Sequence, residues 1–133
     1  MILGVGIDIV EIDRIEKAVR QPRFMSRVFT QKERTYCDSR KSQSAASYAA
    51  RFAAKEAVFK ALGTGMIKGS WLDVEVLPNS SGQPEVTLSG YYRELAREKG
   101  VGQIHISLTH ARSYAAAQVV LWGGVDNEGY NGK

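Results

Sequence analysis

The stretch from Ser44 to Leu62 reads SAASYAARFAAKEAVFKAL, and its composition decides much of the fold. Alanine is the best helix former, and no glycine or proline interrupts the run. Gly63 follows directly, and glycine commonly ends a helix because it tolerates the left-handed backbone conformation. We therefore predict one long helix over residues 44–62, followed by a flexible turn over residues 63–65.

One carboxylate falls within the apolar face of this helix. The face is marked by Tyr48, Phe52, Phe59 and Leu62. Glu56 follows Phe52 by four residues and precedes Phe59 by three, so it shares their face. A carboxylate among apolar side chains is unfavourable unless a positive group meets it. The structural explanation is an ion pair with Lys60, Lys55 or Arg51, and the functional explanation is a metal or catalytic site.

A second carboxylate lies near the N-terminus. Residues 2–10 are rich in Ile and Val and predict a strand. One side of this strand carries Leu3, Val5, Ile7 and Ile9, and the other carries Gly4, Gly6 and Asp8. Asp8 thus lies on a side kept small by two glycines, where another group can approach the backbone. It either caps the following helix or pairs with Glu56 as an oxygen ligand of Mg²⁺, and the sequence leaves both possibilities open.

The rest of the chain alternates between helices and strands. We expect helices at residues 11–20, from Thr30 onward and at 91–99, and strands at 71–77, 85–88, 103–109 and 114–122. Thr30 and Glu33 have the spacing of a capping box, which marks the helix start. Short loops join the strands at 71–77 and 85–88 and those at 103–109 and 114–122, as in antiparallel hairpins. We expect an α+β fold, with a mostly antiparallel sheet packed against the long central helix and shorter helices. We expect one domain over residues 1–122 and a flexible tail over 123–133.

Basic residues concentrate in one segment. The chain has a formal charge of +4, and residues 14–34 hold seven basic and two acidic side chains, so the remainder sums to −1. A local patch of this kind predicts an acidic partner surface or a nearby phosphate. A nucleic-acid-binding module is the rival class, but neither an aromatic RNA-recognition strand nor a helix-turn-helix spacing is present. A purely structural trimer is a third possibility, and it leaves Glu56 unexplained.

Cysteine and histidine are scarce. The single Cys37 cannot form an internal disulfide, and two histidines with one cysteine make a zinc site improbable. His110, at a predicted strand end, is either solvated or a hydrogen-bond donor to a phosphate or ribose. The N-terminus lacks an export signal, and no apolar run approaches the ~18 residues of a membrane-spanning helix. We therefore expect a cytoplasmic protein without a membrane segment.

Four motifs together resemble those of the holo-acyl-carrier-protein synthase family of small 4′-phosphopantetheinyl transferases. They are GIDIVEIDRI at residues 6–15, FTQKE at 29–33, RFAAKEAVFKALG at 51–63 and ISLTH at 106–110. They occur in the family's order, and the resemblance spans residues 2–122, with the third motif the most specific. The tail after Trp122 has no counterpart in the family pattern.

The resemblance implies a reaction and a set of catalytic residues. The reaction is transfer of 4′-phosphopantetheine from coenzyme A to a serine of an apo-acyl carrier protein, for fatty acid biosynthesis, with release of adenosine 3′,5′-bisphosphate. It implies that Asp8 and Glu56 hold Mg²⁺ and that Lys60 faces the phosphate. Phosphoryl transfer depends on positioning and charge neutralisation, which these residues could supply. Glu56 and a metal-bound water are the two candidates for accepting the serine proton.

The resemblance also implies binding surfaces and an assembly. Its coenzyme A-binding positions fall on Arg51, Lys60, Gly63, Gly65, Pro84 and His110. Its carrier-docking positions fall on Arg14, Arg20, Arg23 and Phe24. The family is typically a homotrimer with each site formed across a subunit interface. Acyl carrier proteins are acidic, so the basic segment has a matching partner.

Overall fold

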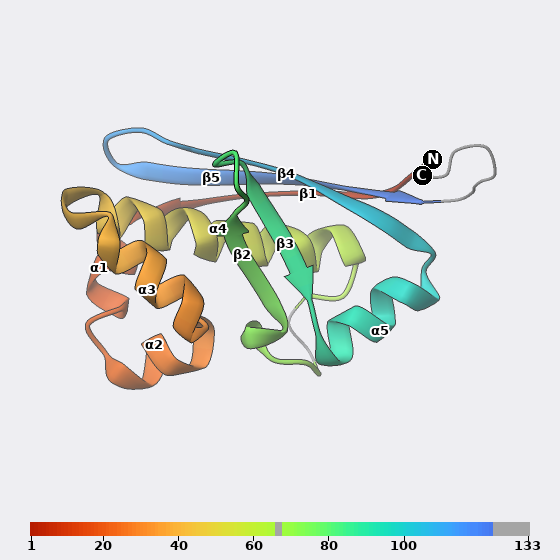
Figure 1. Ribbon diagram of the computed structural model, residues 1–133, viewed down its shortest axis with the longest axis horizontal. Helices are drawn as coiled ribbons and strands as arrows, with labels where there is room; N and C mark the ends of the chain where they lie inside the picture. Colours follow the sequence, from red (N-terminus) through yellow and green to blue (C-terminus); the bar gives the residue numbers. More distant parts are fainter. Residues whose placement is uncertain (66–67, 124–133) are drawn as a thin grey trace.

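A three-stranded antiparallel sheet lies along one side of a 19-residue helix in the computed structural model, which describes residues 1–65 and 68–123 (Figure 1). The strands follow the order β1 (Ile2–Glu11), β5 (Tyr114–Gly123) and β4 (Val101–His110), and the helix is α4 (Ser44–Leu62). Both β1 and β5 pack on α4. The long helix therefore forms the centre of the structure.

Smaller elements lie around α4. They are α1 (Ile12–Ala18), α2 (Pro22–Val28), α3 (Gln31–Ser39), the 3₁₀ turns η1 (Lys41–Gln43) and η2 (Trp71–Asp73), the hairpin strands β2 (Val74–Pro78) and β3 (Pro84–Leu88), and α5 (Gly90–Glu98). In Figure 1, α1, α2 and α3 gather at one end of the molecule and α5 lies at the other. The β2–β3 hairpin crosses α4, and β3 runs close to β4.

The predicted α+β fold is confirmed, with two local corrections. The long helix spans the predicted residues and ends at Gly63, whose φ of 79° is left-handed, and both hydrogen bonds of the Thr30–Glu33 capping box form. The helix α2 was not predicted from the sequence, because proline ends a preceding helix but also favours the first position of a new one. The strand expected from residue 71 starts at Val74, after η2. Gly123 belongs to β5, and the rest of the expected tail lies outside the described residues.

The contact between β1 and α4 is unusually close because two glycines face the helix. A Cβ atom on Gly6 would lie 1.9 Å from the carbonyl oxygen of Ala57, and one on Gly4 would lie 2.2 Å from that of Ala61. Real side chains do not approach backbone oxygens to these distances. The strand backbone therefore rests directly on the helix. Asp8 is two residues beyond Gly6 on the same side of β1, so this contact also places Asp8 beside α4.

A buried ion pair joins the central helix to the elements around it. The Nζ atom of Lys55 lies 2.8 Å from Oε1 of Glu33, and both side chains are fully buried. Lys55 Nζ also donates hydrogen bonds to the carbonyl oxygens of Val28 at 2.7 Å and Trp71 at 3.1 Å. Oε2 of Glu33 accepts a hydrogen bond from the backbone of Val76 at 2.7 Å. Because both charges are paired and hydrogen-bonded, the network can be buried, and it links α2, α3, α4 and the hairpin.

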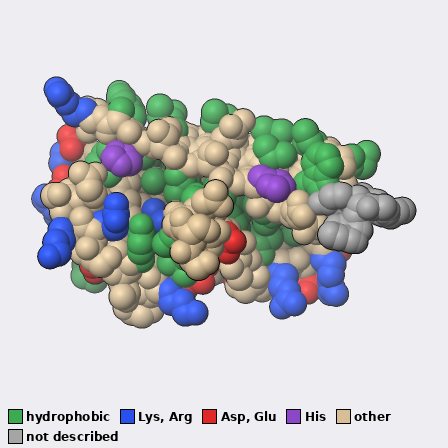
Figure 2. All heavy atoms as spheres, turned by 45° about the horizontal axis from the view of Figure 1, so that its top comes forward, with side chains coloured by type: hydrophobic (Ala, Val, Ile, Leu, Met, Phe, Trp, Pro, Cys, Tyr) green, Lys and Arg blue, Asp and Glu red, His purple; other side chains and the backbone are tan. Residues whose placement is uncertain are grey.

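The outer face of the three-stranded sheet is apolar along β1. As the alternation predicted, Leu3, Val5, Ile7 and Ile9 share one side of the strand. That side points away from α4, and the four side chains are 37% to 64% exposed. Figure 2 shows hydrophobic side chains gathered along the side of the molecule where the sheet lies. On β4 the outward positions are polar, including His105 and Ser107.

In the described part of the chain, no helix is long and apolar enough to span a bilayer.

Replacing Gly6 with alanine should separate β1 from α4. The new methyl group would overlap the Ala57 carbonyl, so we expect Gly6→Ala to lower the free energy of unfolding by about 2 kcal/mol or more. Gly102→Ala is the matched control, because a Cβ atom there would meet only the Trp122 carbonyl oxygen, at an ordinary 3.7 Å. Urea unfolding of both variants measures the difference. Equal unfolding midpoints for Gly6→Ala and the wild type would show that the close contact is not needed.

Candidate active site

Asp8 and Lys60 meet at the free edge of β1. Lys60 Nζ lies 2.9 Å from Oδ1 of Asp8 and donates a second hydrogen bond to the carbonyl oxygen of Ile7 at 3.0 Å. The Asp8 side chain is 14% exposed and that of Lys60 is 53% exposed, so the pair opens to solvent on the lysine side. The N-terminal residue capping α1 is Glu11, which rules out Asp8 as that cap. Asp8 instead lies beside α4, as a metal site shared with Glu56 requires.

Glu56 lies within the electrostatic field of this pair. Partial burial raises the pKa of the Glu56 carboxyl, and the negative charge of Asp8 raises it further. Lys60 and Arg14 act in the opposite direction, and the net pKa is still above its usual value. A carboxylate in this state is poised to bind a cation or to exchange a proton.

The ion pair offered as the structural explanation of Glu56 does not form. Of its three possible partners, Lys55 pairs with Glu33, Lys60 pairs with Asp8, and Arg51 lies on a different side of α4. Within residues 1–65 and 68–123, Glu56 has no ion pair at all. The tertiary structure pairs the two lysines with other carboxylates and directs Arg51 to a different side of the helix.

The two carboxylates suit a hard divalent cation. Mg²⁺ usually takes one or two protein carboxylates and completes its coordination with water and substrate phosphates. Asp8 from β1 and Glu56 from α4 are such a pair, and among the described residues no group of three or more His, Cys, Asp or Glu side chains is placed to hold a metal ion. Cys37 is buried, and burial raises the pKa of its thiol, as expected for a structural residue. The donor set therefore fits Mg²⁺ bound together with a phosphate ligand.

A second candidate region contains a buried arginine. Arg51 is only 6% exposed and lines a cavity of about 150 Å³ between α3, α4 and the end of β4, together with His110. Its Nη1 atom donates to Oγ of Ser47 at 3.2 Å, while its Nε atom has no hydrogen-bond partner. In the described part of the chain Arg51 has no carboxylate partner either. A buried guanidinium lacking an anion is well suited to receive one from a ligand.

These two regions do not converge within one chain. Arg51 and Glu56 are five residues apart on α4, which places them about 140° apart around the helix. Gly63 and Gly65 lie in the turn after α4, both with left-handed φ values, and Tyr92 Oη donates to the Gly65 carbonyl oxygen at 3.2 Å. The structure thus brings Asp8, Glu56 and Lys60 together, and separately Arg51 and His110.

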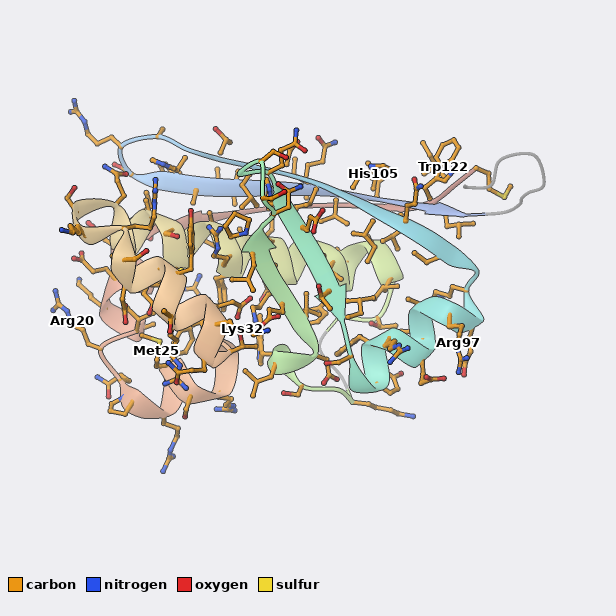
Figure 3. The ribbon with its side chains drawn as sticks, viewed as in Figure 1. Arg20, Met25, Lys32, Arg97, His105 and Trp122 are labelled. Atoms are coloured by element: carbon orange, nitrogen blue, oxygen red, sulfur yellow. The ribbon has the colours of Figure 1, made fainter. Side chains whose placement is uncertain are left out.

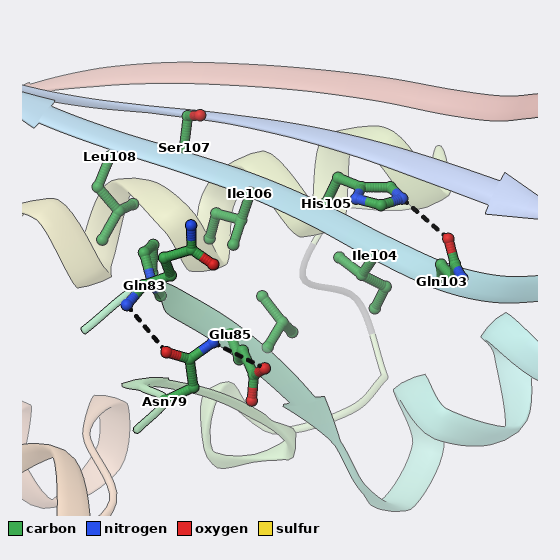
Figure 4. Close-up of a pocket in the computed structure, with 11 residues that line it drawn as sticks. Asn79, Gln83, Glu85, Gln103, Ile104, His105, Ile106, Ser107 and Leu108 are labelled. Carbon is green, nitrogen blue, oxygen red and sulfur yellow. Dashed lines mark hydrogen bonds between the residues drawn. The ribbon is translucent and has the colours of Figure 1, made fainter. Parts of the chain in front are cut away.

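Pro84 belongs to a third region, a groove between β3 and β4. The groove has a volume of about 810 Å³, and polar side chains line much of it: Asn79, Gln83, Glu85, Gln103, His105 and Ser107 (Figure 4). Asn79 orders one wall, because its Oδ1 accepts a hydrogen bond from the backbone of Gln83 at 3.0 Å and its Nδ2 donates to Glu85 at 3.1 Å. Sequence reasoning missed this groove, since residues 79–84 were recognised only as a loop. The polar alternation along residues 103–109 was the available signal.

The predicted carrier-docking residues lie at the end of the molecule formed by α1 and α2. Arg14, Arg20 and Arg23 are exposed, and Figure 3 shows Arg20 projecting outward. Phe24 is half-buried, and its ring centroid lies 6.2 Å from that of Phe29 and 5.9 Å from that of Phe52. Phe24 therefore packs against the core as well as reaching the surface.

Comparison with known proteins gives a consistent result. The 4′-phosphopantetheinyl transferase superfamily model matches residues 4–119. The holo-[acyl-carrier-protein] synthase of Moorella thermoacetica is 49% identical over 128 residues, covering 96% of this chain and 99% of that one. The synthase of Anaeromyxobacter sp. strain K is 47% identical and covers 92% and 98% of the two chains.

Solved structures show the same fold. A holo-(acyl-carrier-protein) synthase from Bacillus anthracis, in complex with CoA (3′,5′-ADP), is 40% identical with a TM-score of 0.78 and covers 93% of this chain and 99% of that one. The synthase of Helicobacter pylori, in complex with coenzyme A, is 36% identical with a TM-score of 0.76 and covers 89% and 99%. The superfamily match, the near full-length relatives and the shared fold agree with the four sequence motifs, and the chain belongs to the 4′-phosphopantetheinyl transferase superfamily.

Proposed function

We propose that the protein transfers the 4′-phosphopantetheine group of coenzyme A to a serine of an apo-acyl carrier protein, a step that supports fatty acid biosynthesis. The main observation behind this proposal is the grouping of Asp8, Glu56 and Lys60 at one edge of the structure. The near full-length relatives are named for this activity, and the Bacillus anthracis and Helicobacter pylori structures hold coenzyme A or its nucleotide.

The reaction is a phosphoryl transfer. The serine oxygen attacks the phosphorus atom that carries the pantetheine arm, and a new P–O bond forms. The bond from that phosphorus to the bridging pyrophosphate oxygen breaks, and adenosine 3′,5′-bisphosphate leaves with the electron pair. The serine proton passes to an acceptor, so atoms and charge balance. Such a reaction depends mainly on the alignment of the two substrates and on neutralisation of the phosphate charge.

Each residue of the group has a role in this scheme. Asp8 and Glu56 would hold Mg²⁺, which would neutralise charge on the pyrophosphate when bound. Lys60, held at Asp8 by a 2.9 Å contact, places its ammonium group where it can stabilise negative charge on the transferred phosphate. Glu56 is the acceptor that this chain itself offers for the serine proton, because its carboxylate has no ion pair among the described residues.

Glu56→Gln should separate activity from stability. Because the pKa of Glu56 is raised, the folded chain binds more protons than the unfolded chain between the usual value of 4.5 and the raised one. The Glu56 contribution to stability therefore falls as pH rises through this window, and the glutamine variant should be as stable as the wild type at pH 7 or more so. Its transfer rate should drop at least roughly 100-fold.

Thermal unfolding at pH 4 to 7 and a coenzyme A consumption assay test this prediction. Glu98→Gln is the control, since Glu98 is exposed on α5, and it should change neither quantity. A Glu56→Gln variant with wild-type transfer activity would contradict the role of Glu56.

We also propose that the active unit is a homotrimer with each site formed between two subunits. The separation of Arg51 and His110 from Asp8 and Glu56 supports this, because one chain alone does not bring the four predicted site residues together. The exposed apolar face of β1 supports it too, since monomeric proteins seldom leave large apolar patches in contact with water.

The predicted cytoplasmic location stays a prediction.

Mixed assemblies test the shared site. Asp8→Ala and His110→Ala should each be inactive alone, because each removes one half of every site. If the variants are unfolded, mixed in equal amounts and refolded, about one interface in four should combine an intact Asp8 with an intact His110. The mixture should therefore recover a measurable fraction of wild-type activity. A fully active monomer in sedimentation experiments, or no recovery in verified mixed trimers, would contradict the shared site.

The basic end of the molecule is the proposed docking surface for the carrier protein. Arg20 and Arg23 are exposed there and can approach an acidic helix. Arg14 is a less specific probe, because it lies close enough to Glu56 to lower the pKa of that carboxyl. Exposed charges of this kind mainly speed encounter and select the partner.

Arg20→Glu should raise the KM for carrier protein roughly tenfold and leave the KM for coenzyme A unchanged. The difference from the wild type should shrink at high salt, because exposed charges are screened. Arg97→Glu, which makes the same change of charge on α5 at the opposite end, is the control (Figure 3). If both variants change the carrier KM equally, that KM depends on the net charge of the protein, and the proposed docking surface at the α1–α2 end is wrong.

A further inference from the structure

Tyr36, on α3, lies against the buried arginine of the second region. The guanidinium carbon of Arg51 is 4.7 Å from the centroid of the Tyr36 ring, and that of Arg40 is 5.8 Å from it. Both arginines and the tyrosine line the cavity of about 150 Å³ that also contains His110. An arginine over an aromatic face gains more from this contact when it is desolvated, and Arg51 is only 6% exposed.

Few other contacts fix the orientation of Arg51. Its Nη1 atom donates to the side-chain and backbone oxygens of Ser47 at 3.2 and 3.5 Å, and its Nε atom has no partner. Ser47 lies one turn earlier on the same helix, so these bonds do not tie the guanidinium to another element. The Tyr36 ring on α3 supplies that second support. A planar guanidinium stacks on an aromatic face while its N–H groups remain directed at a ligand.

We infer that Tyr36 is a positioning residue, whose ring holds the Arg51 guanidinium in the orientation that binds an anionic group of the coenzyme A nucleotide. This inference rests on the proposed function, and it takes Arg51 and His110 to bind that nucleotide, as the family resemblance implies. The Tyr36 ring makes this contact with Arg51, and the hydroxyl group takes no part in it, because the Tyr36 hydroxyl has no hydrogen-bond partner among the described residues.

The test measures nucleotide binding separately from catalysis. Adenosine 3′,5′-bisphosphate is titrated into the protein by calorimetry, and the KM for both substrates and kcat are measured. Tyr36→Leu should weaken nucleotide binding roughly threefold to tenfold and raise the KM for coenzyme A similarly. The KM for carrier protein and kcat should stay unchanged. Tyr36→Phe should bind like the wild type, and Tyr91→Leu, on an exposed tyrosine of α5, is the matched control.

A graded substitution covers the case in which Tyr36→Leu disturbs the fold. Phenylalanine analogues with increasing numbers of ring fluorines keep the shape of the ring and progressively weaken its attraction for cations. Nucleotide affinity should fall with each fluorine while the melting temperature stays constant. An affinity independent of fluorination overturns the inference, and so does a Tyr36→Phe variant as weak as Tyr36→Leu.

Arg51→Lys separates this inference from the proposed function. A lysine keeps the positive charge but cannot stack or bind an anion with two N–H groups, so nucleotide binding should weaken. If Arg51→Lys and Tyr36→Leu both bind like the wild type, the nucleotide lies elsewhere, and the proposed role of Arg51 fails with the inference. If only Arg51→Lys weakens binding, that role stands and the positioning role of Tyr36 is overturned.

Discussion

The contact of the β1 backbone with α4 at Gly4 and Gly6 is the constraint on which the rest of the structure depends. Any side chain at these positions would overlap the carbonyl oxygens of the helix. Their absence lets a strand and a helix touch through their backbones, which fixes the strand's register along the helix. Asp8 therefore lies beside Lys60, and its charge raises the pKa of Glu56. A site built on two rigid elements holds its geometry better than one built on loops.

The central helix separates two kinds of charge. Lys55 and Glu56 are adjacent in sequence, yet one turns inward and the other toward β1, because successive residues point about 100° apart around a helix. The inward lysine satisfies Glu33 and two backbone carbonyls and so fastens α2, α3 and the hairpin to the helix. The outward glutamate is left without an ion pair among the described residues and keeps a raised pKa. The structural charge network thus leaves the functional carboxylate available.

Local signals in the sequence predicted most of the elements. The alanine-rich run defined α4, the capping box defined the start of α3, and the alternation over residues 103–109 defined the two faces of β4. The helix α2 was missed because Pro22 is compatible with both an end and a beginning. In the candidate site, Asp8 and Glu56 stood out as carboxylates in unsuitable surroundings. The basic residues offered as ion-pair partners of Glu56 do not pair with it. Glu33 engages Lys55 and Asp8 engages Lys60, and these tertiary contacts cannot be read from nearness in sequence.

By itself, the sequence determined the fold class, the family and the residue types of the site, because periodicity, capping and motif order are local properties of the chain. Only the tertiary structure decided which charges meet. The pairing of Lys60 with Asp8, the burial of Arg51 over the Tyr36 ring and the groove beside Pro84 all join segments far apart in the sequence. It also showed that one chain holds Asp8 and Arg51 in different regions, because the side chains of α4 point in fixed and different directions around the helix axis.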